Sequence, residues 1–246
     1  MVTTSGARYF LNGFELIKTK GIKRFVFVPF AVNLVLFSFA FYFILGYIQS
    51  SVTYILDLLP SFMSWLSYLL WPIAVIAVLL IFTLVFGTLA NWIAAPFNGI
   101  LSEKIELHLR KQPLGNEGLG AVIKDIPRTL GRELAKLGYF LPRAFVFLLA
   151  FFFLPVIGQI LWFLFGAWMM AIQYCDYPFD NHKIGFKPMR QQLAEDKSRS
   201  FSFGILVSVF SLIPIVNFIV MPVAICGATQ MWVEQMREEA LARRYG

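Results

Sequence analysis

The sequence predicts an all-α integral membrane protein, and its composition is the first reason. Of its 246 residues, 59% are hydrophobic and only 14% are charged, whereas about 25% of the residues in ordinary soluble domains are charged. A soluble fold of this size cannot bury so much apolar surface, and the 27 Phe and 6 Trp suit a lipid-facing or interfacial environment. The composition therefore excludes a disordered chain, a secreted disulfide scaffold and a soluble enzyme.

Four stretches without Asp, Glu, Lys or Arg are the second reason. They cover residues 25–56, 58–102, 144–175 and 200–233. Each is longer than the roughly 20 residues that one membrane span needs. Only Asp57 separates the first two, and Pro60 follows closely, so we expect two long membrane helices joined by a short turn. Pro72 and Pro96 are expected to kink or end the second helix.

The distribution of basic residues gives the orientation. All 21 Lys and Arg lie in the segments 1–24, 103–143, 176–199 and 234–246. Because cytoplasmic loops carry the excess of Lys and Arg, these segments are expected in the cytoplasm, and the Asp57 turn is expected outside. The chain is thus predicted to be one multi-pass membrane domain over residues 1–246, with a cytoplasmic segment at each end.

The last two apolar stretches conflict with this orientation if each crosses the membrane once. Pro155 divides the third stretch into parts of 11 and 20 residues, and Pro214 leaves 14 residues before it in the fourth. As helices, the short parts extend about 17 Å and 21 Å. We therefore expect two re-entrant helical hairpins that penetrate the membrane partly from the cytoplasmic side. Gly158 and Asn217 are the expected left-handed turn residues, and the alternative is two ordinary proline turns.

Re-entrant hairpins restrict the class of protein. Broken helices persist at membrane depth only where protein or a water-filled cavity surrounds them, which favours a translocation protein or a packed oligomer over a simple anchor. Polar groups at a hairpin apex cost several kcal/mol each in lipid, as an order of magnitude. We therefore expect a homo-oligomer whose copies bury these apices.

The charged segment 103–143 is predicted to contain a cytoplasmic amphipathic helix. Its apolar residues recur at helical spacing, and its charges lie on the opposite face. The apolar positions are Leu119, Val122, Ile123, Ile126, Leu130, Leu134 and Leu137. A turn at residues 113–118 separates this helix from the second long one.

The first candidate site is the run Gly21, Ile22, Lys23 and Arg24 directly before the first apolar stretch. A helix N-terminus presents unpaired N–H groups, and a glycine lets the backbone approach an anion closely. Lys23 and Arg24 add positive charge, and the arginine fork suits an oxyanion. The alternative is a plain positive-inside anchor that contacts lipid headgroups.

A second candidate is a row of charges that continues the second long helix. Glu103, Glu106 and Arg110 are spaced i, i+3 and i+7, so they share one helix face and can line an aqueous path. Arg128 and Arg132, at i and i+4 on the amphipathic helix, can line a vestibule or face phosphate headgroups. A solvated cytoplasmic helix end is the alternative for the first row.

Enzyme chemistry has no support in the sequence. P-loop, GxSxG and HExxH motifs are missing, and His108 and His182 are far apart, so we expect no enzyme activity, no cofactor and no metal. Cys175 and Cys226 are expected to be small packed hydrophobes. The net charge of +7 arises from basic residues in the segments that are expected in the cytoplasm. Membrane orientation accounts for this distribution, so nucleic acid is not an expected partner.

Several longer motifs are distributed over nearly the whole chain. They are Asn91–Gly99, Ala171–Lys183, Gly21–Phe25, Pro142–Ala144, Met221–Ala224 and Cys226–Thr229. Together these motifs resemble those of the CysZ family of bacterial sulfate permeases. The resemblance implies two long transmembrane helices plus two partly penetrating hairpins. It also implies an inner-membrane protein that admits sulfate for assimilation into cysteine. One departure is Lys23, where relatives tend to carry Arg, which keeps the charge but loses one guanidinium fork.

The resemblance also implies roles for the candidate residues. Sulfate has no proton to donate at neutral pH, so its site must supply donors, as Gly21–Arg24 does. The implied pathway residues are Glu103, Glu106 and Arg110, with Arg128 and Arg132 as further candidates. The alternative reading of the chain is a membrane-embedded scaffold or regulatory subunit without transport activity. Self-paired charges and sealed hairpin apices would support that reading.

Overall fold

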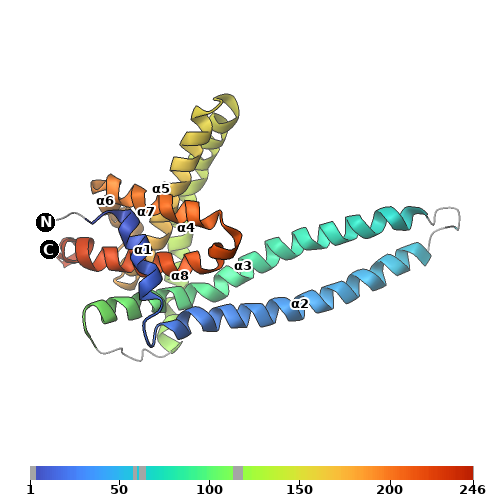
Figure 1. The fold of residues 1–246 in the computed structure, drawn as a ribbon, viewed down its shortest axis with the longest axis horizontal. Coiled ribbons are helices and arrows are strands. Elements are labelled where there is room, and N and C mark those ends of the chain that lie inside the picture. Colours follow the sequence, from blue (N-terminus) through green and yellow to red (C-terminus); the bar gives the residue numbers. More distant parts are fainter. Residues whose placement is uncertain (1–3, 58–59, 61–64, 113–118, 246) are drawn as a thin grey trace. The chain divides into compact units, whose positions relative to one another are not determined.

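The structure is a computed structural model that describes residues 4–57, 60, 65–112 and 119–245. The regular elements among these residues are helices, without a strand (Figure 1). The chain divides into two compact units. The larger combines Met1–Val26 with Asn98–Gly246, and the smaller is Phe27–Phe97.

Two long helices form the smaller unit and extend beyond its limits. α2 (Lys23–Asp57) matches the first apolar stretch closely. α3 (Ser67–Leu109) begins later than expected and continues past the last charge-free residue into the charged segment. Neither Pro72 nor Pro96 ends α3, although both remove a backbone hydrogen bond. Most residues of the expected turn after Asp57, 58–59 and 61–64, lie outside the described residues.

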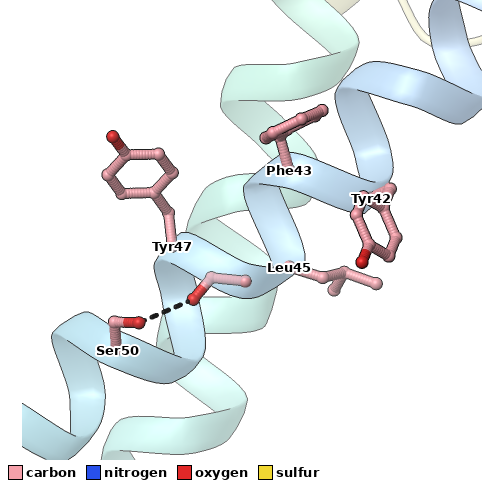
Figure 2. Close-up of a pocket in the computed structure, with 6 residues that line it drawn as sticks. Tyr42, Phe43, Leu45, Tyr47 and Ser50 are labelled. Atoms are coloured by element: carbon pink, nitrogen blue, oxygen red, sulfur yellow. Dashed lines mark hydrogen bonds between the residues drawn. The ribbon is translucent and has the colours of Figure 1, made fainter.

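Most of the exposed side chains that the structure describes in the smaller unit are apolar. Large hydrophobic side chains such as Phe39, Tyr54 and Tyr68 are exposed, as expected for contact with lipid. A depression on α2 is lined by Tyr42, Phe43, Leu45, Gly46, Tyr47 and Ser50 (Figure 2). Its lining includes no charged side chain, and the Ser50 hydroxyl donates to the Gly46 carbonyl at 3.1 Å. The depression therefore offers no positive charge to an anion.

An N-terminal helix that was not expected from the sequence helps to build the larger unit. α1 (Gly6–Leu16) packs against α7 (Lys197–Ser211) and α8 (Pro214–Met231). Its Tyr9 and Phe10 side chains are fully buried. A Cβ atom on Gly13 would lie 2.2 Å from the Val223 carbonyl oxygen, so only glycine permits this close approach.

The first expected hairpin is formed by α4 (Leu119–Phe153) and α5 (Ile157–Asn181), which pack side by side (Figure 1). The residue with a positive φ at its apex is Val156, with φ 66° and ψ −57°, so the expectation of a left-handed turn at Gly158 is wrong. Gly158 lies inside α5, where a Cβ atom would approach the Ala150 carbonyl oxygen to 1.9 Å. The glycine therefore allows the two arms to pack closely near the apex.

The first arm of this hairpin is longer than the charge-free stretch suggested. α4 passes through Pro142 without ending, so the amphipathic helix and the arm are one helix. Among the described residues, three helical segments are long and apolar enough to cross a membrane, namely Leu34–Tyr54, Gly131–Phe153 and Ile157–Asn181. Both arms of this hairpin are long enough to cross the membrane, so their length does not require partial penetration. Partial penetration therefore stays a prediction.

The second hairpin consists of α7 and α8, which are joined at Leu212 and Ile213. Pro214 occupies the first position of α8, where its missing N–H costs no helical hydrogen bond. Asn217 lies in the first turn of α8 and donates its N–H to the Ile213 carbonyl at 2.8 Å. The expected left-handed turn at Asn217 is therefore wrong, because the reversal precedes the proline.

Three short elements complete the larger unit. They are α6 (Phe186–Glu195), a π-helical turn η2 (Trp232–Met236) and α9 (Arg237–Tyr245). Trp232 is fully buried in the core of this unit. The π-turn adds a residue to the helical repeat, which changes the direction of the side chains that follow it.

Candidate functional site

The run Gly21–Arg24 covers the end of the connection between α1 and α2, at Gly21 and Ile22, and the first two residues of α2, Lys23 and Arg24. Gly21 has φ 88°, a backbone conformation that favours glycine. The Ile22 side chain is 1% exposed, and its N–H donates to the Thr19 carbonyl at 3.1 Å. Lys23 and Arg24 have exposed side chains. The connection is thus anchored by Ile22 and presents two cationic side chains beside the start of a helix.

Glu106 lies at the centre of a second group of charges, the Glu106 cluster of Glu106, Arg110, His182 and Arg237. The His182 Nε2 atom lies 2.8 Å and 2.9 Å from the two carboxylate oxygens. Arg237 Nε donates to Glu106 Oε1 at 2.9 Å, and an Arg110 terminal nitrogen lies 3.7 Å from the same oxygen. The Glu106 side chain is 6% exposed, so these contacts replace its hydration.

Electrostatics favours the ionised form of Glu106. Burial raises the pKa of this carboxyl group, but the hydrogen bonds and charges of His182 and Arg237 outweigh burial, and the pKa lies below its ordinary value of 4.5. One carboxylate therefore faces two guanidinium groups and an imidazole. Cations outnumber anions in this cluster, which is the balance that attracts an anion.

The π-turn adjoins the Glu106 cluster. The Trp232 ring lies 5.4 Å from the His182 ring, and Arg237 follows the turn directly. Among the described residues, the buried indole N–H of Trp232 has no hydrogen-bond partner. Glu103, which was expected on the same face as Glu106 and Arg110, is partly buried one turn earlier on α3.

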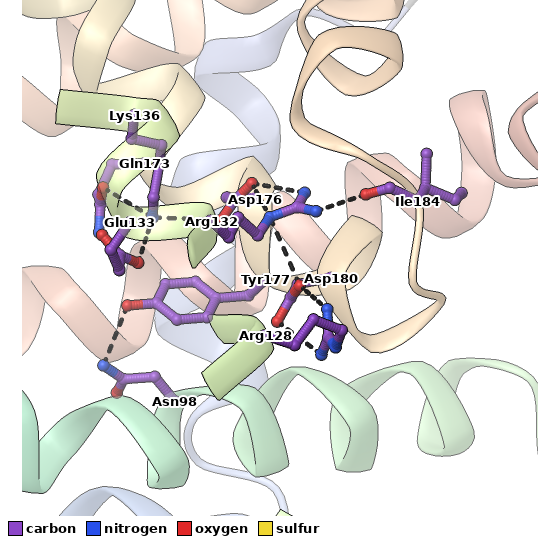
Figure 3. Close-up of polar contacts among 10 residues, drawn as sticks. All are labelled: Asn98, Arg128, Arg132, Glu133, Lys136, Gln173, Asp176, Tyr177, Asp180 and Ile184. Atoms are coloured by element: carbon purple, nitrogen blue, oxygen red, sulfur yellow. Dashed lines mark hydrogen bonds and ion pairs between the residues drawn. The ribbon is translucent and has the colours of Figure 1, made fainter. Parts of the chain in front are cut away.

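A third group of charges joins α4 to α5, and we call it the α4–α5 ladder (Figure 3). It comprises Arg128, Arg132, Glu133 and Lys136 of α4 with Asp176 and Asp180 of α5. Arg132 lies 2.7 Å from Asp176, Lys136 lies 3.2 Å from Asp176, and Arg128 pairs with Asp180. Lys136 also reaches Glu133 at 2.5 Å.

The members of the ladder differ in exposure. The Arg132 and Lys136 side chains are 7% and 6% exposed, whereas that of Arg128 is 36% exposed. Arg132 also donates to the Ile184 carbonyl. Buried charges are tolerated when each is paired and hydrogen-bonded, so the ladder holds α4 and α5 in register.

The structure therefore separates the candidate residues. Glu106 and Arg110 lie together, as their spacing predicted, whereas Arg128 and Arg132 belong to the ladder. Sequence reasoning missed Lys136, Asp176 and Asp180. The i, i+4 spacing of the two aspartates, matched to basic residues at the same spacing, could have revealed this pairing. For His182 and Arg237 the sequence held no comparable signal, because they reach Glu106 from distant elements.

Neutral polar contacts link the end of α3 to α5 and α8. The Ser102 and Thr229 hydroxyls lie 2.9 Å apart and are both fully buried. The Asn98 amide donates to the Tyr177 hydroxyl at 3.2 Å. These contacts connect the helix that carries Glu106 to both hairpins.

The fold and its charges define a class of protein: a helical membrane protein with apolar helices and paired charges buried in its larger unit. Comparison with known proteins gives the family. The family described as "Sulfate transporter CysZ/Etoposide-induced protein 2.4" matches residues 9–222. The chain therefore belongs to this family.

Close relatives extend this match to almost the whole chain. A protein of Pectobacterium atrosepticum is 51% identical over 239 residues, which cover 96% of this chain and 86% of the relative. Relatives from Salmonella paratyphi A and Vibrio cholerae serotype O1 are 50% and 49% identical over 240 residues. These cover 96% of this chain and 94% and 95% of the relatives. All three bear the name "Sulfate transporter CysZ".

Proposed function

We propose that this chain is a sulfate permease that admits sulfate across the bacterial inner membrane for assimilation into cysteine. One observation carries the proposal: relatives about half identical over 96% of the chain bear the name of a sulfate transporter. Apolar helices long enough to cross a membrane support the location of the protein in a membrane. The Glu106 cluster supplies a group of charges in which cations predominate.

Sulfate is a dianion without a proton to donate, so it needs donors and positive charge. Gly21–Arg24 is our proposed binding site, with Lys23 and Arg24 as its cationic side chains and Ile22 as its anchor. Glu103, Glu106 and Arg110 are proposed to line the path. The shared carboxylate of Glu106 weakens the hold of the nearby cations on sulfate, so that the anion can leave again.

The two ladder arginines have different parts in this proposal. Arg128 has a side chain that is 36% exposed, so it can exchange its Asp180 partner for a passing anion. Arg132 is 7% exposed and holds Asp176, so its part is to fix the wall of the path.

The proposed topology places both chain ends and the loops after residue 100 in the cytoplasm. It also makes the chain a multi-pass protein that assembles as a homo-oligomer. Single cysteines at positions 57 and 190, in a chain with Cys175 and Cys226 replaced by Ala, test the orientation. A membrane-impermeant thiol reagent added to intact cells is expected to label position 57 and not position 190. Labelling at 190 from outside would contradict the topology.

A scaffold or regulatory subunit without transport activity is the second candidate. The α4–α5 ladder favours it, because its charges are paired among themselves. In a scaffold, the buried charges hold the helices together and take no part in transporting sulfate.

Sulfate flux separates these two functions. The purified chain alone is reconstituted into liposomes, and entry of radiolabelled sulfate is compared with that in protein-free liposomes. We expect flux that saturates with sulfate and falls in Arg24→Ala. A matched control is Arg8→Ala, since Arg8 is also an exposed cation near the N-terminus. Flux no greater than that of protein-free liposomes would favour the scaffold.

A further inference from the structure

Two arginines from different helices lie over one tyrosine ring at the base of the first hairpin. The guanidinium carbon of Arg143, on α4, is 3.8 Å from the centroid of the Tyr139 ring. That of Arg190, on α6, is 4.3 Å from the same centroid. Trp168 Nε1 donates to the Tyr139 hydroxyl at 3.1 Å, which fixes the ring between α4 and α5.

Neither guanidinium is neutralised by an acid in the part of the chain that the structure describes. Arg143 donates to the Tyr139 carbonyl at 2.9 Å and is otherwise exposed. The acids of the adjoining helices are engaged elsewhere. Glu133 lies against Lys136, Glu195 against Arg243, and Asp176 and Asp180 belong to the ladder. Two positive charges therefore converge on one aromatic ring without a counter-charge.

The surface beside these charges is apolar. On α4, Leu141, Phe145 and Leu149 have exposed side chains, and the charge-free stretch begins directly after Arg143. Basic side chains next to a lipid-facing apolar helix lie at the depth of the phospholipid headgroups. The apolar surface therefore offers room for acyl chains next to a place for a phosphate.

We propose that Tyr139, Arg143 and Arg190 form a binding site for the headgroup of an anionic phospholipid. The phosphodiester is held by the two guanidinium groups, and the acyl chains lie along the exposed apolar side chains of α4. The Tyr139 ring presents both guanidiniums through cation–π contacts. The site is independent of sulfate transport, because none of its three residues belongs to the proposed sulfate path.

Lipid retention measured by native mass spectrometry tests the site. The detergent-purified chain is titrated with dioleoyl phosphatidylglycerol and with dioleoyl phosphatidylcholine of the same chain length. Arg143→Gln combined with Arg190→Gln is expected to weaken binding of the anionic lipid about thirtyfold and to leave the zwitterionic lipid unchanged. The matched control combines Arg8→Gln with Lys197→Gln. It removes the same charge from two exposed positions and is expected to change neither affinity.

Two further arms separate a lipid from a free anion. Inorganic sulfate and phosphate are expected to bind the parent and the Arg143→Gln, Arg190→Gln protein equally. Tyr139→Leu, which keeps both charges but removes the ring, is expected to lose several-fold in affinity for phosphatidylglycerol. Equal loss of lipid in the control double variant would overturn the proposal. So would loss of inorganic sulfate binding in the arginine double variant with lipid binding intact.

Discussion

The two buried charge groups of the larger unit are built on opposite principles. In the α4–α5 ladder, the cations Arg128, Arg132 and Lys136 meet three carboxylates. In the Glu106 cluster, one carboxylate is shared by Arg110, Arg237 and His182. The ladder is balanced, whereas the cluster holds more cationic than anionic groups.

This difference teaches which charges hold the structure and which can act on an anion. A balanced buried network gains specificity of packing, and removing one partner leaves an uncompensated charge. An unbalanced cluster keeps a net positive field, which attracts an anion and is moderated by its single acid. Substitutions in the ladder should therefore change stability, and substitutions at cationic anion sites should change sulfate binding.

The largest expected effect is in the ladder. Asp176→Ala leaves the nearly buried Arg132 and Lys136 without their shared carboxylate. A broken buried pair costs about 3–5 kcal/mol, so we expect a large drop in the midpoint of thermal unfolding in detergent. The control is Glu133→Gln, whose side chain is 48% exposed, and which should change the midpoint little. An unchanged midpoint in Asp176→Ala would mean that the ladder does not stabilise the fold.

Substitution of Arg24, a cation outside both charge groups, should change sulfate binding and leave stability nearly unchanged. If Gly21–Arg24 binds sulfate as we propose, Arg24→Ala removes one charge-assisted contact, which costs about 1.5–3 kcal/mol of binding, or about ten- to hundred-fold in affinity. Its unfolding midpoint should remain close to that of the parent, because the side chain is exposed. Calorimetric titration of sulfate into parent, Arg24→Ala and Arg24→Lys checks this, with the lysine variant expected between the other two.

A bulky substitution at Gly21 cannot test whether sulfate approaches the backbone there. Because Gly21 has φ 88°, valine there would strain the connection whether or not sulfate binds. Side-chain variants are therefore the informative ones. Unchanged sulfate affinity in both Arg24→Ala and Lys23→Gln would transfer the binding site to the Glu106 cluster.

A smaller effect, on release, is expected at Glu106. Glu106→Gln keeps the shape of the side chain but removes the acid between Arg110 and Arg237. Sulfate should then be held more tightly, so that flux saturates at lower sulfate and its maximum falls roughly tenfold, equivalent to about 1.4 kcal/mol. Liposome flux against sulfate concentration measures both quantities. A variant with a raised half-saturation concentration and an unchanged maximum would contradict this role.

The smallest effect concerns pH. The pKa of Glu106 is lower in the folded protein than its ordinary value of 4.5, so the folded state binds fewer protons than the unfolded state around that pH. The stabilisation is complete above that value and is lost as pH falls through the lower, folded-state pKa. Thermal unfolding between pH 7 and pH 3 should therefore decline more in the parent than in Glu106→Gln. Parallel curves would show that this carboxylate does not contribute.

Some features of the protein follow from the sequence alone. The charge-free stretches predicted α2, most of α3 and both hairpins, because a lipid environment demands long apolar segments. Pro155 and Pro214 marked where the two hairpins reverse, whereas α3 and α4 continue through Pro72, Pro96 and Pro142. The spacing of Glu106 and Arg110 predicted a shared helix face, because residues four apart on a helix always adjoin. These features depend only on residues close together in the sequence, because the helical repeat fixes where such residues lie on a helix.

Only the tertiary structure decided which distant charges meet. His182 and Arg237 reach Glu106 from 76 and 131 residues away, and Asp176 reaches Arg132 from 44 residues away. Such contacts depend on helix packing, and here glycines set how closely the helices approach, as Gly13 does against Val223. The turn at Val156 was likewise decided by packing, since the sequence favoured the neighbouring glycine. The sequence by itself determined the membrane-spanning character and the positions of the charges. Packing determined which basic side chains each have a carboxylate partner and which share the single carboxylate of Glu106.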